Sequence, residues 1–176
     1  MANKGFYGLK RQFRSQFLSI KNKIELYKTL IRPVLIYGSE TWVLTKSDEA
    51  ILGVFQRKIL RAIFRPTNDK GKLRIKYNNE LHTLYKESDR VTYIKINRLK
   101  WAGHVIHMEE QSRTRRVLVA VVERRQGGRP KLRWEDGVTE DIRKLGERNW
   151  RNAARKRDSW QKLLKKALAQ KGMLCQ

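Results

Sequence analysis

Cysteine is almost missing from this sequence of 176 residues, which has a single one, Cys175, next to its last residue. One cysteine excludes an intrachain disulfide framework and a zinc site built from cysteines. Reduced thiols are typical of intracellular proteins, so we expect the nucleus or the cytoplasm. No apolar run reaches the roughly 18 residues of a membrane-spanning helix, and the first residues lack the apolar core of a signal peptide. We therefore expect no membrane partner.

Acidic residues are scarce as well. The chain has 17 Asp and Glu against 41 Lys and Arg, which gives a net charge of +24 and a pI of about 10.6. This excess is well beyond the net charge of roughly 2 to 8 that keeps a small domain soluble. It predicts a phosphate-rich partner, namely nucleic acid (RNA, DNA or a hybrid), ahead of an anionic membrane surface.

Apolar residues make up 40% of the sequence, enough for one domain or two small lobes. Most recur at helical spacing and predict a mainly α fold with at most short strands. The segment from Arg98 to Met108 is expected to organise the fold, because its apolar residues share one helix face and place Trp101 in the core. Gly103 costs about 1 kcal/mol relative to Ala in mid-helix, which indicates that another helix crosses closely there. The cations of this helix are expected on other faces: Arg90, Lys95, Arg98 and Lys100.

Two stretches before this helix also have a clear pattern. Thr45 and Asp48 predict a capping box at the start of a helix that runs to Phe64 and stops at Pro66. The apolar run from Pro33 to Trp42 is expected to be tightly buried. Four cations near the end of the helix fit its dipole, and they equally fit an edge that faces phosphate: Arg57, Lys58, Arg61 and Arg65.

The first 23 residues carry six cations and no acid, interleaved with aromatic residues. A disordered arm would not usually hold so many aromatic side chains. Either a preceding piece of protein covers them, or an N-terminal helix packs on the chain's own core. The sequence alone does not distinguish these two readings.

The C-terminal half concentrates cations around a Gly-Arg-Pro motif at 128–130. Such a motif in a basic segment is typical of arms that place arginine in a minor groove. The helix that follows has carboxylates at 135, 136, 140 and 141, which we interpret as a solvated face in preference to a metal-dependent nuclease. His104 and His107 lack a third metal ligand. The last helix, from Trp150 to Leu168, is amphipathic and cationic, so a membrane surface is its rival partner.

Five blocks in order carry a family resemblance: 26–42, 55–61, 98–105, 128–134 and 149–160. Together they resemble the C-terminal part of reverse transcriptases from insect-type non-LTR (LINE-like) retrotransposons. The resemblance covers nearly the whole chain. It implies a thumb-like helical lobe (1–66), a central helical segment (73–112), a basic Gly-Arg-Pro arm (113–133) and basic C-terminal helices (134–176).

The family's polymerase chemistry needs an aromatic-x-Asp-Asp turn that holds two Mg²⁺ ions, and no two aspartates are adjacent here. We therefore expect no catalytic residue, no metal, no cofactor and no enzymatic activity of the chain's own. The resemblance implies RNA-directed DNA polymerase as the parent activity, with this part gripping template–primer or element RNA, and a separately encoded palm as a further partner. A helical protein-interaction module and a non-functional retrotransposon remnant are the alternatives. The candidate nucleic-acid-binding residues are Arg57, Lys58, Arg61, Arg65, Arg98, Lys100, Arg124, Arg125, Arg129, Lys131, Arg133, Arg151 and Arg155.

Overall fold

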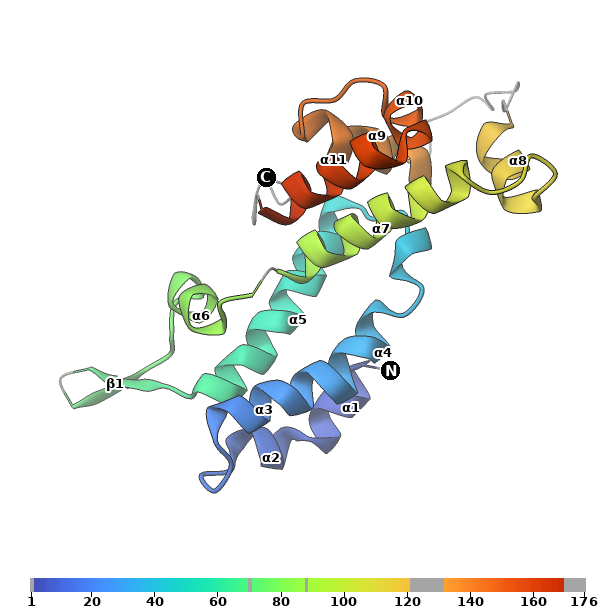
Figure 1. The fold of residues 1–176 in the computed structure, drawn as a ribbon. Coiled ribbons are helices and arrows are strands. Elements are labelled where there is room, and N and C mark those ends of the chain that lie inside the picture. The colour runs from blue at the N-terminus through green and yellow to red at the C-terminus, as the bar shows by residue number, and fades with distance from the viewer. Residues whose placement is uncertain (1, 70, 88, 121–131, 170–176) are drawn as a thin grey trace. The chain divides into compact units, whose positions relative to one another are not determined.

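The computed structural model describes residues 2–69, 71–87, 89–120 and 132–169 (Figure 1). Over these residues the fold is mainly α with one two-stranded sheet, which confirms the fold class that the sequence predicts. The contacts divide the chain into two units. Unit 1 comprises Met1–Tyr37 and Ala50–Glu87, and unit 2 comprises Gly38–Glu49 and Ser88–Gln176.

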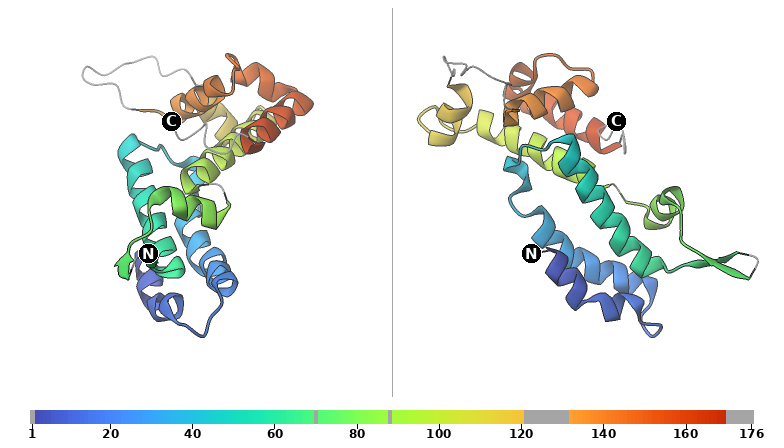
Figure 2. Two further views of the ribbon diagram at one scale, coloured as in Figure 1. Left: turned by 90° about the vertical axis from the view of Figure 1, so that its left-hand side faces the viewer. Right: turned by 180° about the vertical axis from the view of Figure 1, so that it is seen from behind.

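Unit 1 consists of short helices, the greater part of a long helix and a hairpin. Its elements are α1 (Ala2–Gly8), α2 (Lys10–Arg14), α3 (Ile20–Leu26), the π-helical turn η1 (Tyr27–Ile31), α4 (Arg32–Ile36), α5 (Lys46–Phe64, from Ala50 onward), β1 (Thr67–Asp69), β2 (Lys72–Arg74) and α6 (Asn78–Tyr85). Helix α1 contacts α2, η1 and α4, and these helices lie side by side (Figure 2).

The N-terminal aromatic residues belong to the core of unit 1. Phe6 and Phe13 are buried and stack with ring centroids 6.2 Å apart. They pack in one cluster with Tyr27 and with Ile59 of α5. For Phe6 and Phe13, the prediction that an N-terminal helix packs on the chain's own core is therefore confirmed. Phe17, in contrast, is fully exposed.

Helix α5 begins and ends where the sequence predicts. The Thr45 amide donates to Asp48 Oδ2 at 3.0 Å, and the Asp48 amide donates to Thr45 Oγ1 at 3.2 Å, which is a reciprocal capping box. The helix ends at Phe64, and Arg65 takes the left-handed conformation with φ of 57° just before Pro66. A proline cannot continue the hydrogen bonding of the helix, so the chain turns away at this point.

The predicted burial of Pro33–Trp42 is wrong. Helix α4 has no buried residue, Val34 is 51% exposed and Tyr37 is 86% exposed. Successive apolar residues on a helix point in different directions, and the core cluster of unit 1 includes Ile31 but no residue of α4. Gly38, with φ of 67°, then ends the helical stretch in the left-handed conformation. Leu84 of α6 (Asn78–Tyr85) is exposed as well.

A short hairpin follows α5, in keeping with the prediction of at most short strands. Strands β1 and β2 pair antiparallel with Thr67 opposite Arg74, and Ile75 and Tyr77 lie beyond the pairing. Arg74 fixes the hairpin to α6, because its guanidinium donates to both oxygens of Glu80 at 2.7 and 3.1 Å. The hairpin extends away from the helices of unit 1 (Figure 1).

Unit 2 is organised around α7 (Arg90–Ile106), as the sequence predicts. The 3₁₀ turn η2 (Ser39–Thr41), α8 (Arg113–Val119), α9 (Trp134–Lys144), α10 (Trp150–Arg155) and α11 (Arg157–Ala169) all contact it (Figure 1). Its core joins residues of α7, α9, α10 and α11: Ile96, Leu99, Ala102, Val138, Ile142, Leu145, Trp150, Ala154, Trp160 and Ala167. The last amphipathic stretch is thus two helices, with a break at Lys156.

The close crossing at Gly103 is confirmed. A Cβ on Gly103 would lie 2.9 Å from Cε2 of Trp160 and still closer to Nε1, so glycine is what lets α11 approach α7. Trp101 is only half-buried and lies beside His104, with ring centroids 5.3 Å apart. The core tryptophan at this crossing is therefore Trp160, and the expected full burial of Trp101 is wrong.

Candidate nucleic-acid interface

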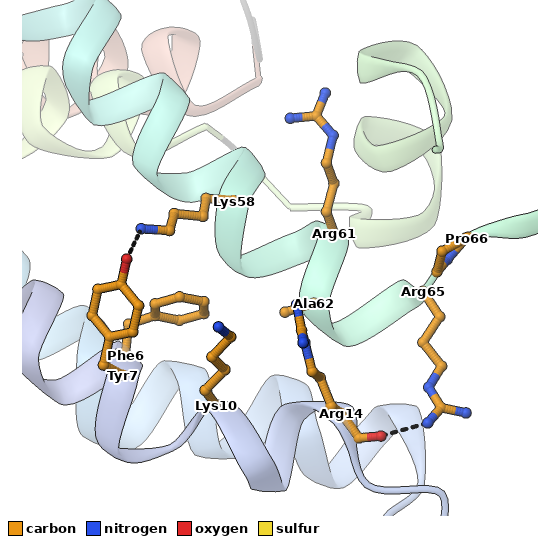
Figure 3. Close-up of a pocket in the computed structure, with 9 residues that line it drawn as sticks. All are labelled: Phe6, Tyr7, Lys10, Arg14, Lys58, Arg61, Ala62, Arg65 and Pro66. Atoms are coloured by element: carbon orange, nitrogen blue, oxygen red, sulfur yellow. Dashed lines mark hydrogen bonds between the residues drawn. The ribbon is translucent and has the colours of Figure 1, made fainter. Parts of the chain in front are cut away.

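A basic pocket opens in unit 1 between α1–α2 and the C-terminal half of α5 (Figure 3). Its volume is about 440 Å³. Five of its lining residues are Lys or Arg, and none of the nine described residues that line it is acidic. We call this site the basic pocket; it is lined by Phe6, Tyr7, Lys10, Arg14, Lys58, Arg61, Ala62, Arg65 and Pro66.

Helical spacing brings these cations together. Lys58 and Arg61 are three residues apart on α5, which places them along one side of the helix, and Arg65 is the first residue after it. Lys10 and Arg14 are four residues apart on the opposite wall, at the two ends of α2. The buried rings of Phe6 and Phe13 fix α1 and α2 against the core, so the positions of the cations are set by packing.

Tyr7 and Lys58 form the contact at one end of the basic pocket. Lys58 Nζ donates to Tyr7 Oη at 3.0 Å and lies 4.6 Å from the centroid of the Tyr7 ring (Figure 3). This hydrogen bond, together with the positive charge of Lys58, lowers the pKa of the Tyr7 hydroxyl. Lys10 lies 5.6 Å from the same ring, and no carboxylate among the residues that line the pocket offsets these charges.

Cations also cluster at the other end of the basic pocket. Arg65 donates to the carbonyl oxygen of Arg14, so its guanidinium is held across the pocket wall (Figure 3). The buried Lys23 donates to the carbonyl of Ser15 at 2.7 Å, and burial, followed by the charge of Arg65, lowers its pKa. Like charges held this close repel one another, and a bound anion would relieve that repulsion.

Three of the candidate residues at the C-terminal end of α5 therefore share one site: Lys58, Arg61 and Arg65. Arg57 does not line the pocket, since its guanidinium folds back over Gly53, where a Cβ would lie 3.0 Å from Nη1. Lys10 and Arg14 were not among the candidates. Their four-residue spacing indicates a shared helix face, but only the fold places that face opposite α5.

The prediction that Arg98 lies on an outer face of its helix is wrong. Arg98 is 3% exposed, and its guanidinium pairs with the carboxylate of Asp141 and donates to the carbonyl of Gly137 at 3.3 Å. A Cβ on Gly137 would lie 2.6 Å from Arg98 Nη1, so this glycine makes room for the guanidinium. Arg98 thus joins α7 to α9 and cannot reach a nucleic acid. The amphipathic pattern failed because it assigns every cation to the outside, whereas a paired cation can be buried.

The same correction applies to its neighbours. Arg90 and Lys95 are also buried, and Lys95 Nζ lies 2.7 Å from Glu49 Oε1. Asp141, expected on a solvated helix face, is 2% exposed; burial raises its pKa, while the charge of Arg98 opposes that shift. Within the described residues, no three His, Cys, Asp or Glu side chains come together in a way that could hold a metal ion.

The remaining candidates of unit 2 differ in their surroundings. Arg151 donates to Leu118 O at 3.2 Å and pairs with Glu135 at 2.7 Å, so it links α10 to α8 and α9. Lys100, Arg133 and Arg155 are exposed. Four candidates, with the Gly-Arg-Pro motif, lie outside the described residues: Arg124, Arg125, Arg129 and Lys131.

A comparison with known proteins finds a transposon-derived protein of Caenorhabditis elegans, 23% identical over 128 residues. The chain is similar to a transposon-derived protein. This match covers 69% of the chain and 44% of the nematode protein, so the chain spans less than half the length of that relative. This similarity supports a transposon origin for the sequence. No family model and no solved structure matches the chain. None of the described helices has the length and apolar character needed to cross a membrane.

Proposed function

We propose that the chain is a nucleic-acid-binding segment of a retrotransposon reverse transcriptase, corresponding to the thumb and C-terminal extension, that grips template–primer or element RNA. The observation that carries this proposal is the basic pocket, where five cations from α2 and the C-terminal end of α5 converge without an acid among the nine lining residues. The similarity to a transposon-derived protein supports it. Catalytic aspartates would come from another segment or another chain.

The physical basis is phosphate neutralisation. Each Lys or Arg that meets a phosphate releases condensed counterions, so affinity falls as salt rises. If all five cations of the pocket contact phosphates, duplex affinity should fall about 10²- to 10³-fold between 50 and 200 mM salt. Contacts made by cations elsewhere in the chain would steepen this dependence. Primer extension with Mg²⁺ and nucleotides should yield no product from the chain alone.

A charge-matched pair of triple variants tests the pocket. Lys10→Gln, Arg14→Gln and Lys58→Gln together remove three charges from it. The control replaces three exposed cations of unit 1 that do not line it: Lys4, Arg11 and Lys21. Fluorescence anisotropy in 100 mM salt should show at least a tenfold larger loss of affinity for the pocket variant, with both circular dichroism spectra unchanged. Equal losses would assign binding to bulk charge, and a wild-type chain that does not bind at 50 mM salt would reject the proposal.

One observation favours the interaction module as a second function. Leu30, Val34 and Tyr37 are 51%, 51% and 86% exposed on η1, α4 and the residue that follows. Contiguous apolar side chains on a surface mark binding sites for other proteins. If a separately encoded palm docks there, Leu30→Asp with Val34→Asp should abolish its recruitment while nucleic-acid affinity stays unchanged.

A further inference from the structure

We propose that the basic pocket binds one unpaired nucleotide, and that the chain therefore prefers single strands and unpaired ends to continuous duplex. This inference rests on the proposed function and specifies its ligand. The five cations by themselves would serve any nucleic acid. The selectivity comes from the rest of the lining, which is apolar.

The pocket is concave, with apolar groups between its charged walls. Ala62 and Pro66 line it together with the cations, while the buried Phe6 ring, only 2% exposed, adds little open surface (Figure 3). A continuous duplex presents phosphates on a convex surface and keeps its bases stacked inside, so its bases would not reach these groups. An unpaired base can enter. The volume of about 440 Å³ lies within the range of roughly 300 to 1,000 Å³ found for small-molecule sites.

An aromatic side chain stands beside this apolar surface. Tyr7 is 54% exposed, and its ring lies in edge contact with that of Phe6, with centroids 5.4 Å apart. Aromatic rings are the usual contact surface for unpaired bases, and they accept any base because each has a π face. A base held here would be read without sequence preference.

The cations are placed to hold the phosphates of such a nucleotide. Lys58 Nζ lies 5.2 Å from the centroid of the Phe6 ring and 4.6 Å from that of Tyr7, so its charge is directly beside the apolar lining. Lys10 approaches the Tyr7 ring as well, at 5.6 Å. Base and phosphate could therefore be contacted at once, which a purely cationic surface would not do.

A variant that fills the pocket without changing its charge distinguishes binding of an unpaired base from binding of phosphate by the cations alone. Ala62→Leu adds bulk to the lining and has nearly the same helix propensity. Ala50→Leu, at an exposed position of the same helix outside the pocket, is the control.

The probes are a single-stranded 12-mer of deoxythymidine, a blunt 12-base-pair duplex, and that duplex with one unpaired 3′ nucleotide. Wild type and control should bind the single strand and the overhang several-fold tighter than the blunt duplex. Ala62→Leu should lose about tenfold for the first two and less than twofold for the blunt duplex.

A measurement on the wild type keeps the inference testable if Ala62→Leu does not fold. An unpaired 3′ 2-aminopurine should be quenched on binding by contact with the Tyr7 ring, whereas the same base inside the duplex should not change. Equal affinity of the wild type for all three probes, an equal loss for all three in Ala62→Leu, or an unquenched overhang would overturn the inference while leaving the proposed function intact. Failure of the wild type to bind any probe in 50 mM salt would instead reject the proposed function.

Discussion

The two units are both strongly basic, but they use their cations differently. Unit 1 has 17 Lys and Arg against 4 Asp and Glu, and unit 2 has 24 against 13. Their net charges, +13 and +11, are nearly the same. In unit 1 a group of cations lines a pocket without a carboxylate, whereas Lys95, Arg98 and Arg151 of unit 2 are paired with acids of the same unit.

This difference shows that net charge alone does not identify a binding surface. A cation paired with a buried carboxylate has lost its hydration shell, and it stabilises the fold only as long as the partner is present. A cation without such a partner keeps its capacity for phosphate. Under the proposed function, the position of each cation within the fold therefore decides whether it can contact phosphate.

The largest expected effect concerns the pair of Arg98 and Asp141. Replacing either partner alone, by Arg98→Met or Asp141→Leu, should lower the stability of unit 2 by about 3 to 5 kcal/mol, because an uncompensated charge stays buried. The double replacement should recover most of the loss. Urea unfolding followed by tryptophan fluorescence measures this, since all five tryptophans belong to unit 2. Single variants as stable as the wild type would place Arg98 on the surface and restore it as a binding candidate.

The next effect distinguishes the two tryptophans of the Gly103 crossing region. Trp160→Ala should destabilise unit 2 by about 3 to 5 kcal/mol, the usual cost of emptying a core site of this size. Trp101→Ala should cost clearly less, since Trp101 is only half-buried. Thermal unfolding followed by circular dichroism compares them. A larger loss for Trp101 would return it to the core and contradict the packing of Trp160 on Gly103.

Sequence patterns predicted the parts of the fold that local chemistry determines. The capping box at Thr45 and the close approach at Gly103 each depend on a few residues, and both are confirmed. The burial of Arg98 was not predictable, because its partner Asp141 is 43 residues away and only the fold brings them together. The same limit hid Lys10 and Arg14, whose role depends on α5 lying opposite.

A smaller effect compares two exposed lysines, one in each unit. Lys58→Gln should weaken nucleic-acid binding several-fold and reduce the slope of log affinity against log salt by about 1, as the loss of one phosphate contact does. Lys100→Gln in α7 removes the same charge, and we expect a smaller change, because Lys100 does not line the basic pocket. Anisotropy titrations from 50 to 200 mM salt give both slopes. Equal slopes would extend the binding surface into unit 2.

The smallest effect concerns Glu80, one of the few acids of unit 1. The hydrogen bonds from Arg74, and then that from the Tyr77 amide, lower the pKa of its carboxyl from the usual 4.5 to about 2. Because the pKa is lower in the folded chain, the contact stabilises the hairpin fully above pH 4.5, and this contribution is lost as the pH falls through about 2. A carboxyl titration by NMR should find this value, and Arg74→Gln should raise it towards 4.5. Neither residue lines the basic pocket, so nucleic-acid affinity at neutral pH should change far less than in Lys58→Gln. If Arg74→Gln weakened binding as strongly as Lys58→Gln, the phosphate-contacting surface of unit 1 would include the hairpin and extend beyond the basic pocket.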